Sequence, residues 1–270
     1  MFKLYKDLFA LYWILVLVAG ISLAVLGVFS ENFLLVILAV IVIPLFAVII
    51  LEIIAQKRFK KINQIREINC NIARYYEELN QLRIKCKDKK LLSFLECNIS
   101  VAFLDLGRYS DALCCLLGIN IADLGKGTLD IQNQIVYFNN LACAYIELGD
   151  FEKAEQALEN MRVNIESPKI SSNAANKSFW FDYYNVKKMI IQIKKGNFEG
   201  AEQFFLSMLD KATSNIHQVY ESYHLAFVYM NTNRPEQAKR YIDFVLNYGG
   251  DTVYRAKTLQ LKASGQGESL

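Results

Sequence analysis

The stretch that decides the fold is FNNLACAYIELGDFEKAEQAL, residues 138–158. It joins an apolar helical pattern, a Gly-Asp turn, an aromatic residue and an alanine, and this order recurs elsewhere in the chain. The other copies are Ile99–Leu113, Gly196–Phe205 and Leu225–Ala238. The marker alanines Ala112, Ala154, Ala201 and Ala238 lie 42, 47 and 37 residues apart. Self-similarity at such spacings is typical of repeat architectures, so we expect a helical solenoid.

The quoted stretch resembles a tetratricopeptide repeat (TPR), a helix–turn–helix motif. The resemblance implies that Leu141 and Ala142 pack the first helix against its partner. It also implies that Gly149-Asp150 forms the turn and that Ala154 lets the two helices approach closely.

The resemblance covers roughly residues 93–248, and its copies lie further apart than the family's usual spacing of about 34 residues. The third copy departs from the family pattern at Lys188, Met189 and Gln192, where apolar, small and large residues are usual. We therefore expect an all-α fold, with a TPR-like α-solenoid of about four helix pairs in residues 93–263. Residues 252–263 would form a closing helix, polar on one side as terminal repeats require. Residues 264–270 would form a disordered tail.

Two long uncharged segments precede the repeats. Residues 8–29 contain no charged side chain, and residues 33–55 contain only Glu52. At about 1.5 Å per residue the first segment spans about 33 Å, enough for a hydrocarbon core of about 30 Å. Since only Ser30-Glu31-Asn32 separates them, we expect a transmembrane hairpin within residues 1–56. The alternatives are a cleaved signal peptide, whose apolar core is usually shorter, and a pair of buried core helices.

Basic residues flank the hairpin at both of its chain ends. They are Lys3, Lys6, Lys57, Arg58, Lys60, Lys61 and Arg66, and the connecting turn has none. By the positive-inside rule both termini are expected in the cytoplasm. The cluster after the second span would lie near anionic headgroups of the lipid bilayer. The Ile-, Lys- and Asn-rich composition is typical of a bacterial protein, so we expect a bacterial plasma membrane.

The hairpin is predicted to continue into an amphipathic helix. From Phe59 to Leu82, apolar residues recur at three- and four-residue steps with polar residues between them. We expect this helix to run to about Cys86, to connect the two parts of the chain within residues 57–92, and to pack on the first repeat. The alternative is a helix that lies on the lipid surface.

The motifs of common enzyme classes are absent from the sequence. It has no Gly-rich phosphate loop, no H-E-x-x-H, no G-x-S-x-G and no calcium loop. The six cysteines include no C-x-x-C pair, and His217 and His224 lie far from them in sequence, so we expect no metal site and no cofactor. Among aromatic residues, His224 is expected to be a packed or binding-surface residue. The net charge of +3 argues against a nucleic-acid partner. We expect a protein without enzymatic activity.

The TPR family uses the first helix of each repeat to line a concave groove. The resemblance assigns to this groove the residues Phe94, Cys97, Val101, Leu104, Val136, Asn139, Cys143, Ile146, Tyr183, Val186, Ile190, Tyr220, Tyr223, Phe227 and Met230. Such a groove would be apolar and aromatic, with very few charges. Members that grip a C-terminal carboxylate use a clamp of Lys, Asn and Arg. Cys97 and Val101 stand at the first two clamp positions, which argues against that use.

An apolar groove of this size is expected to be covered. Either an apolar peptide or amphipathic helix of a partner binds there, or a segment of the same chain fills it, and we favour the partner. The sequence thus predicts a membrane-anchored scaffold or adaptor that binds an unknown protein or peptide partner at the cytoplasmic face. The alternatives are a peptide-sensing regulatory receptor of the TPR type and an accessory subunit of a membrane enzyme complex.

Overall fold

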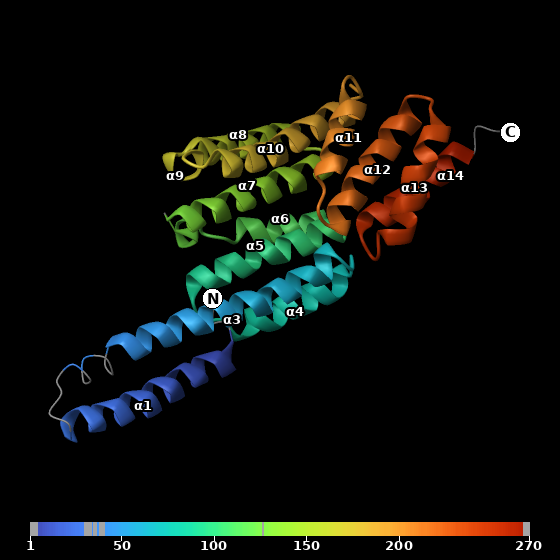
Figure 1. Ribbon diagram of the computed structural model, residues 1–270. Helices are drawn as coiled ribbons and strands as arrows, with labels where there is room; N and C mark the ends of the chain where they lie inside the picture. The colour runs from blue at the N-terminus through green and yellow to red at the C-terminus, as the bar shows by residue number, and fades with distance from the viewer. Residues whose placement is uncertain (1–4, 30–33, 35–36, 38–40, 126, 267–270) are drawn as a thin grey trace. The chain divides into compact units, whose positions relative to one another are not determined.

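The computed structural model describes residues 5–29, 34, 37, 41–125 and 127–266 (Figure 1). Within these ranges the regular elements are helices and no strand is present, which confirms the all-α prediction. The chain divides into two compact units. The first holds residues up to Asn63 together with Ile84–Cys86, and the second holds Gln64–Arg83 and the residues from Lys87 onward.

The first unit contains α1 (Lys6–Phe29) and most of α3 (Ile43–Glu67). Leu8 packs with Leu51 and Ala55 in a small apolar cluster. Next to this cluster Arg58 Nη1 donates to Asp7 Oδ2 at 2.6 Å. These contacts bring the start of α1 against the middle of α3.

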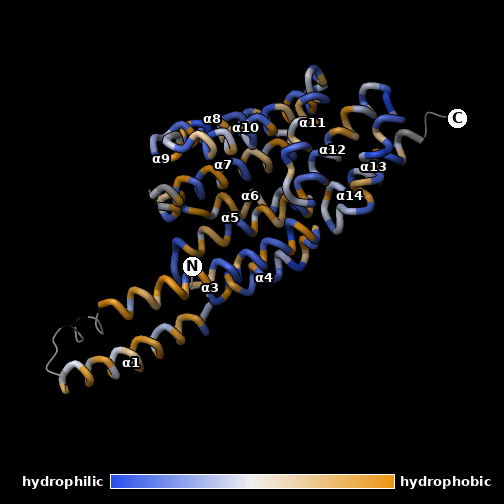
Figure 2. Tube along the Cα trace, in the orientation of Figure 1, coloured by the Kyte–Doolittle hydropathy of each residue, from blue (hydrophilic) through white to orange (hydrophobic). Residues whose placement is uncertain are grey.

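The helix α1 is apolar along its length, as Figure 2 shows. Its segment Asp7–Gly27 is long and apolar enough to cross a membrane, and no other helix in the described ranges passes that test. The second expected span, residues 33–55, lies partly outside the described residues, as does the turn at 30–32. From residue 43 onward that span forms the start of α3.

The second unit is built from helix pairs. These pairs are α5 (Lys89–Asp105) with α6 (Tyr109–Leu117), α7 (Thr128–Leu148) with α8 (Phe151–Glu166), α10 (Ala174–Lys194) with α11 (Ala201–Lys211), and α12 (Asn215–Asn231) with α13 (Pro235–Tyr248). Short helices η3 (Ile121–Leu124) and α9 (Pro168–Ser171) lie in the connections. All four marker alanines have 0% exposure. The TPR-like solenoid of four helix pairs is therefore confirmed.

The turn inside each pair has the same backbone conformation. Gly107, Gly149 and Gly196 have φ of 76°, 81° and 84°, and Asn233 at the equivalent place in the fourth pair has φ of 56°. Glycine adopts this left-handed conformation without strain, and asparagine tolerates it better than most residues do. In each repeat, one turn residue with a positive φ thus reverses the direction of the chain.

The expected single helix from the second span to Cys86 is wrong. The helix α3 ends at Glu67 and α4 (Ile72–Lys85) begins after a short break. In this break Cys70 takes a positive φ of 48°, and its carbonyl accepts a hydrogen bond from Asp251 N at 3.2 Å. Because a distant segment stabilises the break, local periodicity could not predict it.

The last helix, α14 (Val253–Gln266), packs on α12 and α13 as the expected closing helix. It is longer than expected, because residues 264–266, predicted to begin a disordered tail, are helical, and residues 267–270 lie outside the described residues. It and the turn before it also reach the first helices of the unit. A Cβ on Gly107 would lie 2.6 Å from Val253 Cγ2, and Lys257 Nζ lies 2.6 Å from Glu147 Oε2. In addition, Asn215 Nδ2 donates to the Ile68 carbonyl at 2.6 Å. The last helices of the second unit therefore contact its first helices.

Candidate functional site

The second unit holds a partly open cavity of about 500 Å³. Its walls come from the last turn of α3, from α5, α6, α7, α10, α11, α12 and α14, and from the connection between α11 and α12. This volume lies within the range of ligand-binding pockets, about 300–1,000 Å³. The cavity is therefore the candidate functional site.

Many residues that the TPR resemblance assigned to the groove line this cavity. They are Val101, Leu104, Asn139, Cys143, Ile146, Tyr183, Val186, Ile190 and Tyr220. They come from the first helices of all four pairs, and the third pair contributes despite its weak match to the family pattern. Cys97 instead lies in the hydrophobic core at 2% exposure.

The other predicted groove residues lie away from the cavity. These are Phe94, Val136, Tyr223, Phe227 and Met230, all half-buried. The Tyr223 ring packs on Tyr254 of α14, with centroids 5.5 Å apart, and the Phe227 ring packs near Phe198 at 6.2 Å. At this end of the groove the chain's own last helix covers the surface.

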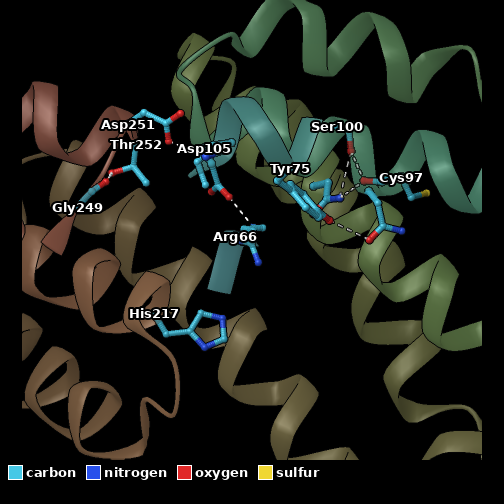
Figure 3. A network of polar contacts seen from close by, with 12 residues as sticks. Arg66, Tyr75, Cys97, Ser100, Asp105, His217, Gly249, Asp251 and Thr252 are labelled. Atoms are coloured by element: carbon cyan, nitrogen blue, oxygen red, sulfur yellow. Dashed lines mark hydrogen bonds and ion pairs between the residues drawn. The ribbon is translucent and has the colours of Figure 1, made fainter. Parts of the chain in front are cut away.

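The expectation of a groove with very few charges is wrong. Charged residues along the cavity are Arg66, Glu67, Asp105, Glu147, Asp182, Lys187, Lys211 and Glu221. Arg66 Nε donates to Asp105 Oδ2 at 2.6 Å (Figure 3), and Lys211 pairs with Asp182 at 2.9 Å. Arg66 was expected in the basic cluster near the headgroups, but the break after Glu67 brings it to the cavity. Glu147 pairs with both Lys194 and Lys257.

Other polar groups near the cavity serve the packing of the helices. Asn140 Nδ2 donates to the Cys97 carbonyl and to Ser100 Oγ, both at 3.2 Å. Tyr75 OH donates to Asn98 Oδ1 at 3.3 Å and so joins α4 to α5. These side chains are committed to internal contacts.

Lys187 is the most unusual of the cavity residues. Its side chain is buried at 6% exposure, and its Nζ donates to Tyr220 OH at 2.8 Å. It also contacts the Cys143 thiol. Within the part of the chain that the structure describes, no carboxylate lies within 4.0 Å of Lys187 Nζ. A buried charge without an opposite partner is costly, so this position calls for a functional explanation.

Glu221 lies next to Tyr220 on the same helix and is 7% exposed. Its Oε2 is buried and has no hydrogen-bond partner among the described residues. Burial raises the pKa of Glu221 to about 8, although the charge of Lys187 opposes this shift. Near pH 7 the protonated form of Glu221 therefore predominates, and its hydroxyl can donate a hydrogen bond.

The two histidines are both held neutral. Burial, with the charges of Arg66 and Lys187, lowers the pKa of His217 to about 4, and its Nε2 lies 3.1 Å from Tyr183 OH. His224 is 4% exposed among aromatic rings, and burial lowers its pKa well below the ordinary value. Neither group belongs to a cluster that could hold a metal ion in the described ranges.

Comparison with known proteins identifies the family. The sequence model of the SusR N-terminal TPR domain matches residues 69–243. The chain therefore belongs to the SusR N-terminal TPR domain family. The match begins before α4, which sequence analysis had placed in the connecting segment. No curated protein and no solved structure matches the chain significantly.

The sequence did not predict the charged residues of the cavity, among them Arg66, Lys187 and Glu221. For Lys187 a signal was present, because it lies four residues after Tyr183 and three before Ile190, on the same helical face. Glu221 likewise lies four residues before the buried Leu225. A charge on an apolar helical face is a usable marker of a polar interior site. Arg66 gave no such signal, since only the tertiary fold brings it to the cavity.

Proposed function

We propose that this protein is a membrane-anchored TPR receptor without enzymatic activity, which binds a ligand in its internal cavity and a protein partner at the cytoplasmic face. TPR domains are protein-interaction modules, and this assigns the general class of the second unit. The observation that carries the receptor proposal is the cavity of about 500 Å³ with its buried, unpartnered polar groups.

The size of the cavity suits a small-molecule ligand. Its volume of about 500 Å³ lies within the range of about 300–1,000 Å³ that is usual for ligand-binding pockets. The charged lining also suits a polar ligand better than an apolar peptide. Both observations support the receptor over a scaffold that grips an apolar helix.

The apolar helix α1 supports the membrane anchor. Most of its large apolar side chains are exposed, with Trp13, Leu17 and Ile21 at 50%, 56% and 60%. A helix that is apolar all round is expected either in a protein core or in a membrane, and this one is largely uncovered by protein. The exposed side chains of Lys57, Arg58, Lys60 and Lys61 on α3 favour a cytoplasmic position for the residues that follow.

The anchor is tested by cysteine labelling. Cys114 is exposed on α6 and is the suitable reporter, since Cys97 is buried. A maleimide that cannot cross membranes should leave Cys114 unlabelled in intact cells and label it after permeabilisation. Labelling in intact cells, or recovery of the protein in the soluble fraction, would contradict the proposal.

The receptor function is tested by filling the cavity. Val101 is a half-buried residue of its wall, so Val101→Phe reduces the free volume. The full chain in nanodiscs is incubated with the cellular fraction below about 1 kDa, a range that includes ligands of this pocket size. We expect a rise in Tm for the wild type and for the outer-face variant Val163→Phe, but none for Val101→Phe. Equal shifts for all three would show that the ligand binds elsewhere.

A further inference from the structure

We propose that the cavity recognises a small organic acid through a single carboxylate, which binds at Lys187, Tyr220 and Glu221. This inference rests on the proposed receptor function and names the chemistry of its ligand. It follows from three side chains that line one cavity and from the charges that remain without a partner there.

The first observation is the imbalance of charge around Lys187. The cations Arg66 and Lys211 each have a carboxylate partner, at 2.6 and 2.9 Å. The Lys187 side chain is more buried than those of Arg66 and Lys211, and it has no carboxylate partner in the described parts of the chain. A lysine ammonium has three donor hydrogens, and Tyr220 with Cys143 accounts for two of them. One positive charge and one donor are left for a ligand.

The second observation is the direction of the bond between Lys187 and Tyr220. The Tyr220 oxygen accepts this bond, so its own hydroxyl hydrogen is free to point at a ligand atom. The ring is fixed between His224 and Tyr254, with centroids 4.5 and 5.1 Å away. The hydroxyl is therefore a rigid donor at the cavity wall.

The third observation is Glu221, the neighbour of Tyr220. Its buried Oε2 lacks a partner, and the raised pKa keeps the group mainly protonated near pH 7. In that state it adds no negative charge that would repel an anion, and its hydroxyl has no partner among the described residues.

The charge balance selects the type of anion. The single charge of Lys187, which has no carboxylate within 4.0 Å in the described residues, matches a singly charged carboxylate, whereas a phosphate dianion would also be repelled by Glu67 in the lining. The remaining walls include Val101, Ile146 and Ile190, which suit an apolar body attached to the acid group. We therefore expect a monocarboxylic acid with a partly apolar body.

The test uses benzoate as the probe and benzamide as its neutral counterpart, with inorganic phosphate as a third arm. The full chain in nanodiscs is measured by thermal unfolding at constant ionic strength, at probe concentrations up to about 100 mM. A fragment of this size is expected to bind with a Kd of about 1–10 mM. At about 100 mM, benzoate should raise the Tm by about 3–10 °C. Benzamide should bind at least tenfold more weakly, and phosphate should give no saturable shift.

Two variants assign the effect to the proposed residues. Lys187→Met should reduce benzoate affinity at least tenfold, and Tyr220→Phe should reduce it several-fold. The control Lys195→Met removes the same charge from the solvent-exposed end of α10 and should bind benzoate as the wild type does. Without ligand, Lys187→Met should be at least as stable as the wild type, because it removes an unpaired buried charge.

Three results would overturn the inference: no saturable effect of benzoate, equal binding of benzamide, or unchanged affinity in Lys187→Met. Binding of phosphate in place of benzoate would also overturn it. Equal binding of benzamide would leave the receptor function standing, because the cavity would still hold a ligand. If the cellular fraction of the cavity-filling experiment also gave no shift, the receptor function itself would fail.

Discussion

Asp251 caps the N-terminus of the helix that begins at Ile72. Its Oδ1 accepts a hydrogen bond from Ile72 N at 2.6 Å, and its Oδ2 accepts one from Ala73 N at 2.9 Å. The backbone N–H groups at a helix start have no partner within the helix, so a carboxylate at that place is stabilising. Here the cap comes from a residue 179 positions away in sequence, and it joins the two ends of the repeat domain.

Asp251→Ala should lower the free energy of unfolding by about 1–2 kcal/mol, the usual cost of losing an N-cap. Urea unfolding of the chain measures the change. Hydrogen exchange should speed up at Ile72 and Ala73 more than elsewhere. The control Asp243→Ala, on an exposed position of α13, should stay within about 0.5 kcal/mol of the wild type. Equal effects of both substitutions would contradict the capping role.

Gly250→Ala should destabilise the domain far more than Gly149→Ala. Both glycines have a positive φ, of 54° and 81°, so each substitution meets the same backbone strain of about 1–2 kcal/mol. A Cβ at Gly250 would in addition fall on the Cys70 carbonyl oxygen, whereas one at Gly149 meets nothing within 4 Å. Thermal unfolding of the two variants compares them directly. Similar Tm values would mean that the contact between Gly250 and Cys70 does not hold the domain closed.

Arg66→Met should cost about 3–5 kcal/mol, because it leaves Asp105 buried without its partner. Adding Asp105→Leu to the same chain should recover most of this loss, since the double variant has no buried charge at that place. The exposed pair Arg108–Asp111 supplies the control, and Arg108→Met should cost less than about 1 kcal/mol. If the double variant were as unstable as Arg66→Met, the unpaired charge would not be the cause.

Stability should fall in acid through His217. Its pKa is about 4 in the folded protein and about 6.5 when unfolded, so between these values the unfolded chain binds more protons. Its contribution is therefore present above pH 6.5 and is lost as the pH falls toward 4, a change of up to about 3 kcal/mol. Glu221 acts in the opposite direction, because its raised pKa favours the folded state as the pH falls below about 8.

The variant His217→Gln isolates the effect of His217, because it keeps a partner for Tyr183 and cannot titrate. The difference between wild type and variant in urea unfolding should shrink by about 3 kcal/mol from pH 7 to pH 4. A difference that stays constant over this range would show that His217 titrates alike in the folded and unfolded chains.

The helix pairs could be predicted from sequence because each is specified locally. Gly149 supplies the left-handed turn residue, and Ala154, with no exposed surface, permits the close approach of α7 and α8. Such short-range features can be recognised in the sequence of a single copy of the repeat. The apolar character of α1 is equally local.

The closure of the domain could not be predicted, because its parts lie far apart in sequence. The local sign of the helix break is Asn71, whose Oδ1 accepts a hydrogen bond from Arg74 N at 3.1 Å. The other groups that stabilise the break come from the distant residues Gly250 and Asp251. For the same reason, sequence analysis expected an open apolar groove. The fold instead brings Arg66 to the site and lays Tyr254 against Tyr220, and the result is a mainly apolar cavity with charged residues in its lining.

Native mass spectrometry of the full chain, released from nanodiscs prepared directly from cell membranes, shows whether the cavity holds an acid. We expect the wild type to carry the added mass of a small acid and Lys187→Met to lose this mass while remaining folded. Identical, ligand-free spectra for the two proteins, or the same added mass on both, would contradict this expectation.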